Sequence, residues 1–250
     1  GRLTALLCAV FSAQRGVDSQ SVIYSAQCWG DPFQGGDCSS INFGGATGAS
    51  STDSAFVVFV EDIGNGQCWG SPSFGGNCVN EDIRGVTDIY STGGAFMSLN
   101  RVNGNAVCWG SEADGGACSN LNFFGYTDVY SNFGSFVALD KVNGRALCWG
   151  RVTGGGDCSG VDFAGVTEVY STRFAHVALR QDGSGQCWGS SSSGGECSGR
   201  NFTGVTAVAA TWNAFAAFSV EDGTAQCWGD SAAGGNCSGL DFSGVTDIVA

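Results

Sequence analysis

Hydrophobic and polar residues alternate with a period of two in short stretches of this chain. Residues 55–60 and 86–90 are two such stretches, both rich in β-branched and aromatic residues, which is typical of β-strands. An Asn-Gly or Asp-Gly pair separates neighbouring stretches and predicts a two-residue hairpin turn, because these residues tolerate positive φ. These pairs are Asn65-Gly66, Asn103-Gly104, Asn143-Gly144, Asp182-Gly183 and Asp222-Gly223.

The tripeptide Cys-Trp-Gly marks an internal repeat of about 40 residues. It starts at Cys28, Cys68, Cys108, Cys148, Cys187 and Cys227. A second cysteine follows ten positions later, at Cys38, Cys78, Cys118, Cys158, Cys197 and Cys237. A glycine pair precedes each second cysteine, an apolar residue follows it by five positions and threonine follows it by nine.

A repeat of this length with three or four antiparallel strands has the size of a propeller blade. We therefore predict an all-β fold, a six-bladed β-propeller in which residues 1–250 form one domain. A β-solenoid is the alternative, but solenoid coils are usually shorter and lack a hairpin in each repeat. The last repeat lacks two strands that residues 9–13 and 22–27 can supply. Residues 1–27 and 238–250 would then complete the closing blade, unless a seventh blade includes residues 1–8.

The charge balance excludes several classes of partner. The chain has 10 basic and 23 acidic residues, for a formal net charge of −13. Nucleic acids and anionic membrane surfaces are recognised by clustered lysine and arginine. The apolar run at residues 3–11 is too short to span a bilayer. We expect no nucleic-acid partner and no membrane insertion.

The twelve repeat cysteines allow two interpretations, metal ligands or disulfides. Zinc sites favour closer spacing, such as Cys-x2-Cys, and the sequence contains no such pair. The glycine pair between the two cysteines of each repeat allows a bend that brings their Cα atoms within bonding range. We predict one disulfide per blade and hence an oxidising compartment, with a secreted or cell-surface protein. Cys8 is the unpaired thiol; it is a buried apolar residue or, alternatively, an intermolecular half-cystine.

The sequence offers no catalytic constellation. His176 is the only histidine and occupies a position held by phenylalanine in four other repeats, so we interpret it as a core residue hydrogen-bonded to backbone. Adjacent carboxylates near predicted turns are interpreted as solvated charge; they are Glu61-Asp62, Glu81-Asp82 and Glu221-Asp222. No phosphate loop, EF-hand loop or dinucleotide fingerprint occurs. We expect no enzyme activity, catalytic residue, metal or cofactor.

The tryptophans divide into two groups. Six belong to the Cys-Trp-Gly motif, and their regular recurrence favours packing between blades over sugar stacking. Trp212 lies outside the motif, in a loop-like stretch where other repeats carry glycine or a polar residue, and is the candidate binding residue. Two sequons, at Asn201 and Asn236, are candidate glycosylation sites. The second contains Cys237, which would make it a poorer acceptor.

Two segments carry a family resemblance: AHVALRQDGSGQCWGSSSSGG (residues 175–195) and AFAAFSVEDGTAQCWGDSAAGG (residues 214–235). They resemble the repeats of the regulator of chromosome condensation superfamily, which includes a nuclear exchange factor, a propeller-type β-lactamase inhibitor and many binding modules. The cysteine placement is more similar to the ectodomain repeats of plant crinkly-type receptor kinases. The resemblance implies a β-propeller. This sequence departs from both groups because it shows no kinase region, transmembrane helix or basic tail.

We therefore expect a non-catalytic extracellular structural or protein-interaction module, a subunit of a larger assembly such as a filament or surface coat. The apolar segment 3–13 motivates the assembly, because such a strand can add to a neighbour's sheet edge. The alternative is a carbohydrate-binding propeller or a receptor-type ligand-binding ectodomain. The residues between paired cysteines vary among repeats, which argues against identical sugar sites. An inhibitor or exchange-factor role has no specific support in the sequence.

Overall fold

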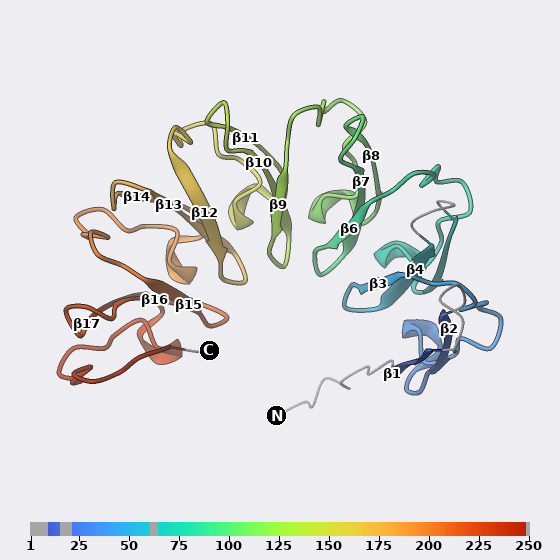
Figure 1. Cartoon of the computed structure of the whole chain (residues 1–250), viewed down its shortest axis with the longest axis horizontal. Coiled ribbons are helices and arrows are strands. Elements are labelled where there is room, and N and C mark those ends of the chain that lie inside the picture. Colours follow the sequence, from blue (N-terminus) through green and yellow to red (C-terminus); the bar gives the residue numbers. More distant parts are fainter. Residues whose placement is uncertain (1–9, 16–21, 61–64, 249–250) are drawn as a thin grey trace. The chain divides into compact units, whose positions relative to one another are not determined.

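The computed structural model describes residues 10–15, 22–60 and 65–248, and these residues form strands and single-turn 3-10 helices (Figure 1). The chain divides into two compact units, one ending at Phe124 and the other beginning at Gly125. Five three-stranded antiparallel sheets and one two-stranded sheet make up the described fold. The predicted all-β fold built from repeats of about 40 residues is confirmed.

The first unit contains the two-stranded sheet and two three-stranded sheets. Its strands are β1 (Val10–Arg15), β2 (Val22–Gln27), β3 (Gly48–Ser51), β4 (Ala55–Val60), β5 (Asn65–Gly70), β6 (Asp88–Ser91), β7 (Ala95–Asn100) and β8 (Asn105–Gly110). Its 3-10 helices are η1 (Pro32–Gln34), η2 (Pro72–Phe74) and η3 (Glu112–Asp114).

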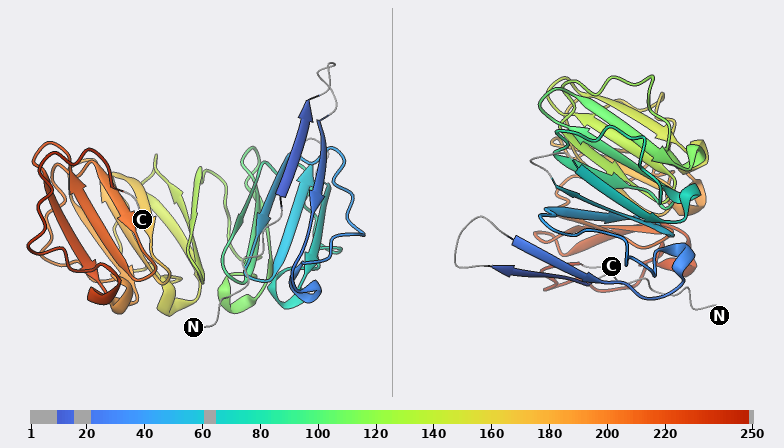
Figure 2. Two further views of the ribbon diagram at one scale, coloured as in Figure 1. Left: turned by 90° about the horizontal axis from the view of Figure 1, so that it is seen from below. Right: turned by 90° about the vertical axis from the view of Figure 1, so that its right-hand side faces the viewer.

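The second unit contains three sheets of the same design. Its strands are β9 (Asp128–Ser131), β10 (Ser135–Asp140), β11 (Arg145–Gly150), β12 (Val166–Ser171), β13 (Ala175–Arg180), β14 (Gly185–Gly189), β15 (Ala207–Ala210), β16 (Ala214–Ser219) and β17 (Thr224–Gly229). Its helices are η4 (Val152–Gly154), η5 (Ser191–Ser193) and η6 (Ser231–Ala233). Within each unit the helices lie at the same end of the sheets (Figure 2).

The hairpins between the second and third strands differ from the prediction. The connecting loops contain four residues, 101–104, 141–144, 181–184 and 220–223, rather than two. Gly104 ends its loop at φ 73°, so the glycine supplies the positive φ that was expected, at a different loop position. Asn65 and Gly66 are wrong as a turn, because they begin β5 and pair with Val60 and Phe59.

The two-stranded sheet matches the second and third strands of a complete repeat. Val10 pairs with Gln27, as Val58 pairs with Gln67 in the next sheet. The expected strand over 22–27 is confirmed, and the described part of the other strand is 10–15. Ala9 lies outside the described residues. The single domain and the closed ring stay predictions.

Adjacent repeats are joined through the motif tryptophans. The Trp69 indole Nε1 donates a 3.1 Å hydrogen bond to the carbonyl oxygen of Gly35, and its ring stacks on Phe56. Equivalent indole bonds join Trp109 to Gly75, Trp188 to Gly155 and Trp228 to Gly194. The predicted role of these tryptophans in packing between repeats is therefore confirmed at these four positions.

The glycine pair is required because side chains at these two positions would clash with their neighbours. Gly35 lies at φ 93°, and a Cβ there would come within 2.5 Å of the Phe56 ring in the next repeat. A Cβ on Gly36 would come within 2.5 Å of the Gly30 backbone, closer than real Cβ contacts. The chain can therefore bend beneath the aromatic stack only where both side chains are absent.

Candidate functional site

Every repeat contains one disulfide beside its glycine pair. The six bonds join cysteines ten residues apart, with Cα–Cα distances of 5.6–5.8 Å. They are Cys28–Cys38, Cys68–Cys78, Cys108–Cys118, Cys148–Cys158, Cys187–Cys197 and Cys227–Cys237. Such a density of disulfides indicates an extracellular or otherwise oxidising location. Cys8 lies outside the described residues.

His176 is a core residue, as predicted from its position in the repeat. It is fully buried and stacks on Trp188 with ring centroids 5.0 Å apart. Its hydrogen-bond partners are side chains rather than the expected backbone groups: Ser171 Oγ lies 2.7 Å from Nδ1, and Ser135 Oγ and Asn132 Nδ2 lie 3.0 and 3.1 Å from Nε2. Burial lowers the pKa of His176 to about 3. The ring is therefore a neutral packing element.

The two carboxylate pairs within the described residues make only local contacts. Asp82 is exposed and forms a 2.6 Å ion pair with Arg84; hydrogen bonds from Arg84 lower the pKa of Asp82 to about 2. Asp222 accepts a hydrogen bond from Ser219 in its own hairpin. Glu61 and Asp62 lie outside the described residues. Within residues 10–15, 22–60 and 65–248, no group of three or more His, Cys, Asp or Glu side chains is arranged to hold a metal ion.

Trp212 lies in the loop between β15 and β16, and 69% of its surface is exposed. This loop position recurs between the first two strands of every complete sheet. A backbone hydrogen bond of 2.9 Å runs from Arg173 N to the Trp212 carbonyl, and one of 3.2 Å runs from Phe133 N to the Arg173 carbonyl. We call this series of loop-to-loop bonds the loop ladder. It brings residues about 40 positions apart in sequence next to one another.

Arg173 lies among three aromatic rings on this ladder. Its guanidinium carbon is 4.2 Å from the ring centroid of Phe133, 4.6 Å from that of Trp212 and 5.0 Å from that of Phe174. Phe133 and Phe174 also make an edge-to-face contact at 5.5 Å. We call Phe133, Arg173, Phe174 and Trp212 the Arg173 cluster. Cation–π attraction holds the guanidinium over the ring faces.

The positive charge of Arg173 is not neutralised within the described chain. No carboxylate in residues 10–15, 22–60 and 65–248 forms an ion pair with it. Its Nε is buried and has no hydrogen-bond partner. The acidic chain thus holds one guanidinium against aromatic rings, beside an exposed tryptophan.

The sequence identified only one of these four residues. Trp212 is the residue that the sequence predicts, but the expectation that other repeats carry glycine or a polar residue in this stretch is wrong for Phe133 and Phe174. Phe133, Arg173 and Phe174 were missed. A column-by-column comparison of the loop shows Asp53, Gly93, Phe133, Arg173 and Trp212 at one position, and the last three are large residues in consecutive repeats.

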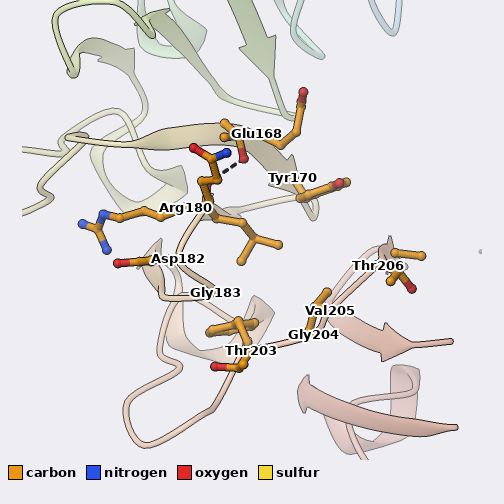
Figure 3. Close-up of a pocket in the computed structure, with 14 residues that line it drawn as sticks. Glu168, Tyr170, Arg180, Asp182, Gly183, Thr203, Gly204, Val205 and Thr206 are labelled. Carbon is orange, nitrogen blue, oxygen red and sulfur yellow. Dashed lines mark hydrogen bonds between the residues drawn. The ribbon is translucent and has the colours of Figure 1, made fainter. Parts of the chain in front are cut away.

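A second feature of the same unit is a cavity of about 460 Å³ between the β12–β14 and β15–β17 repeats (Figure 3). Glu168 and Tyr170 lie on one side, and Val205, Thr206 and Ala207 lie on the other. Burial, with a smaller effect of the Glu168 carboxylate, raises the pKa of Tyr170, so its phenol keeps its proton. We call this cavity the Tyr170 pocket.

Both sequons lie on the surface. The side chains of Asn201 and Asn236 each accept a hydrogen bond from the backbone N–H two residues later, at 3.0 Å. Both asparagines are exposed, and their glycosylation stays a prediction. As for membrane association, the described residues include no helix of the length and apolarity needed to span a bilayer.

Comparison with known proteins gives structural likenesses only. No protein-family model and no curated protein sequence matches the chain. The chain is similar to the ectodomain of the Physcomitrella patens receptor kinase CR4, with 19% identity and a TM-score of 0.49 over 78% of this chain and 55% of that one. The CRINKLY WD40 ectodomain of the Arabidopsis thaliana receptor kinase ACR4 has 16% identity and a TM-score of 0.47, over 74% and 63%.

A yeast protein shows a similar likeness. Prp20p of Saccharomyces cerevisiae has 15% identity and a TM-score of 0.44, over 70% of this chain and 55% of that one. The chain spans 55–63% of the length of these three structures. The resemblance expected from the repeats is confirmed: the structural matches are crinkly-type ectodomains and propellers of the regulator of chromosome condensation type.

Proposed function

We propose that this protein is a non-catalytic extracellular binding module that recognises a protein partner through the Arg173 cluster. The observation that carries the proposal is the guanidinium of Arg173, which lies among three aromatic rings without a carboxylate partner. The exposed Trp212 ring extends this surface. Tryptophan and arginine dominate the binding energy of protein interfaces.

The cluster is preorganised, which supports a binding role. Backbone hydrogen bonds hold Phe133, Arg173 and Trp212 in register, so little loop ordering remains to oppose binding. An interface carboxylate that reaches Arg173 would supply the missing ion pair in a partly dehydrated site. The partner surface we propose therefore combines an acidic side chain with an apolar contact.

We also propose that the chain forms one closed six-bladed ring. Trp29 is 45% exposed, whereas the other five motif tryptophans are 2–7% exposed. In the last repeat, a Cβ on Gly234 would meet only a Thr211 methyl at 4.0 Å. Four equivalents, Gly35, Gly75, Gly155 and Gly194, face an aromatic ring of the next repeat. Within the described residues, no repeat packs against Trp29 or against Gly234 as in the other repeats. In a closed ring, the repeat that contains Gly234 would pack against the repeat that contains Trp29.

The binding proposal is tested with a displayed library of extracellular domains. Wild-type protein is screened beside Arg173→Ala and Trp212→Ala variants. We expect partners whose affinity falls at least about tenfold in both variants, the loss typical of truncated hot-spot residues. Arg84→Ala is the matched control, because Arg84 is an exposed, ion-paired arginine of the other unit, and it should leave affinity unchanged.

Partners indifferent to both cluster variants would contradict the proposal. Hits on a glycan array that are lost in Trp212→Ala would replace it with the carbohydrate-binding alternative. The filament or surface-coat role stays a prediction that no described contact tests.

A further inference from the structure

The Tyr170 pocket occupies a place that a lysine fills one repeat earlier. In that repeat Lys141 Nζ lies 3.3 Å from Asp128 Oδ1 and 3.5 Å from Glu168 Oε1. The Tyr130 hydroxyl donates to Glu168 Oε2 at 3.1 Å. The ammonium thus lies between two carboxylates from adjacent repeats, beside a tyrosine.

The next pair of repeats, β12–β14 and β15–β17, keeps the acid and the tyrosine but not the cation or the second acid. By repeat position Glu168 corresponds to Asp128 and Tyr170 to Tyr130. Gln181 occupies the repeat position of Lys141, and Ala207 occupies the repeat position of Glu168. The internal cation and the far carboxylate are therefore both replaced, and a cavity of about 460 Å³ is present between the two sides.

A second repeat shows the same acid–tyrosine pair bound to a cation. In the first unit Arg101 bonds Asp88 through Nε and the Tyr90 hydroxyl through its terminal nitrogen, both at 2.5 Å. The acid and tyrosine two residues apart thus bind an arginine in one repeat, while in the next the acid binds a lysine. In the third, no described group hydrogen-bonds to the Tyr170 hydroxyl, and Lys141 of the preceding repeat is the only cation among the described residues that forms an ion pair with Glu168.

The remaining walls suit a long basic side chain. Leu179, Phe202 and Val205 offer apolar surface for a methylene stem. The only basic residue lining the pocket, Arg180, donates to the carbonyls of Ala164 and Asp162, and it extends away from Tyr170 and Val205 (Figure 3). Its charge is therefore directed out of the cavity.

We propose that the Tyr170 pocket binds a lysine or arginine side chain of a protein partner. The ammonium or guanidinium contacts the Glu168 carboxylate and the Tyr170 hydroxyl, as Lys141 and Arg101 contact their own acids. The net charge of −13 favours the approach of such a group. The pocket is formed without any residue of the Arg173 cluster, so either proposal can fail while the other stands.

The test uses capped single amino acids and NMR. Nα-acetyl-lysine methylamide and its arginine analogue are titrated into the disulfide-bonded protein, and the methyl resonances of Leu179 and Val205 are followed. We expect saturable shifts with both cations and none with the norleucine analogue, which has the lysine stem without its charge. Glu168→Gln should weaken binding about tenfold, whereas Glu112→Gln, which removes an exposed charge from the other unit, should not.

Glu168→Gln also removes the ion pair between Glu168 and Lys141, so a second variant is needed that leaves this ion pair intact. The double variant Gln181→Lys/Ala207→Glu rebuilds the preceding repeat's arrangement and should fill the pocket. We expect it to keep the unfolding midpoint of the wild type and to lose lysine binding. Equal shifts with norleucine, no saturable shift with either cation, or full binding by the double variant would each overturn the proposal.

Discussion

The indole nitrogen of Trp188 donates a 3.0 Å hydrogen bond to the carbonyl oxygen of Gly155, 33 residues earlier in the chain. The bond is buried, and it joins two repeats at the glycine whose missing side chain makes room for His176. This contact therefore depends on the tryptophan and on the first glycine of the pair together. This explains why both recur in the same motif.

Trp188→Phe should lower the free energy of unfolding by about 1–3 kcal/mol, because the Gly155 carbonyl would be left buried without a donor. Denaturant unfolding measures the change. Trp212→Phe is the matched control, since this ring is exposed and a phenyl ring preserves most of the contact with Arg173; we expect a change below about 0.5 kcal/mol. Equal losses in the two variants would contradict the role of the buried bond.

Removing one disulfide should destabilise the protein without unfolding it. A Cys148→Ala/Cys158→Ala variant loses a ten-residue cross-link and should lose about 2–4 kcal/mol of unfolding free energy. The matched comparison is Cys8→Ser, which removes a cysteine outside the six bridges. Alkylation of the unreduced, denatured wild type, followed by mass analysis, should label none of the twelve repeat cysteines. Labelling of any pair would contradict the oxidised state of its repeat.

His176 should make stability depend on pH. Burial lowers the pKa of the folded imidazole to about 3, whereas an unfolded histidine titrates near 6.5. As the pH falls below about 6.5, the unfolded chain binds a proton that the folded chain does not. Above that pH, His176 is neutral in both states and does not change the stability. Between pH 6 and 4, its titration in the unfolded chain lowers the free energy of unfolding by up to about 1.4 kcal/mol per pH unit.

The control for this prediction restores the residues of the other repeats. In the variant His176→Phe/Asn132→Thr/Ser135→Ala, the ring and the two residues of the preceding repeat match Phe96 with Thr52 and Ala55, and Phe215 with Thr172 and Ala175. It retains every carboxylate, so subtracting its pH profile from that of the wild type isolates the histidine. Parallel profiles for the two proteins would show that His176 does not titrate on unfolding.

Ring closure predicts a specific cross-link. By repeat register Ile248 corresponds to Val208, which pairs with Ala217, and Val10 corresponds to Ala217 through its pairing with Gln27. In a Cys8→Ser background, Val10→Cys/Ile248→Cys should form an intramolecular disulfide, since paired strand positions lie within bonding range.

Mass analysis under non-reducing conditions tells closure from assembly. A bridge within one chain supports the ring, and a covalent dimer or multimer would instead support strand addition between copies. Val10→Cys/Ser243→Cys is the matched control, because Ser243 lies outside the predicted strand, and it should form no bridge within the chain.

Recurrence explains what the sequence could predict. The strands, the disulfides and the packing of the motif tryptophans each appear several times at fixed spacing, so one interpretation is checked by the other repeats. The hairpin loops were mispredicted because Asn-Gly and Asp-Gly suit four-residue loops as well as two-residue ones, and composition does not give the pairing register.

The candidate sites could not be predicted in this way, because they depend on departures from the repeat. Phe133, Arg173 and Trp212 differ in type and share only a loop position, so no periodic signal connects them. The Tyr170 pocket depends on two replacements, Gln181 for a lysine and Ala207 for an acid. Its existence follows from the loss of a contact between repeats, which only the spatial arrangement shows.

The loop ladder separates the scaffold from the residues it presents. Its hydrogen bonds use main-chain atoms, as between Asp53 N and the Gly93 carbonyl at 3.0 Å, so any residue except proline can make them. Mutations there alter the surface while the loop is preserved. A gene that grew by duplication of one unit would thereby acquire a row of sites free to diverge, and new binding preferences would evolve without a cost to folding.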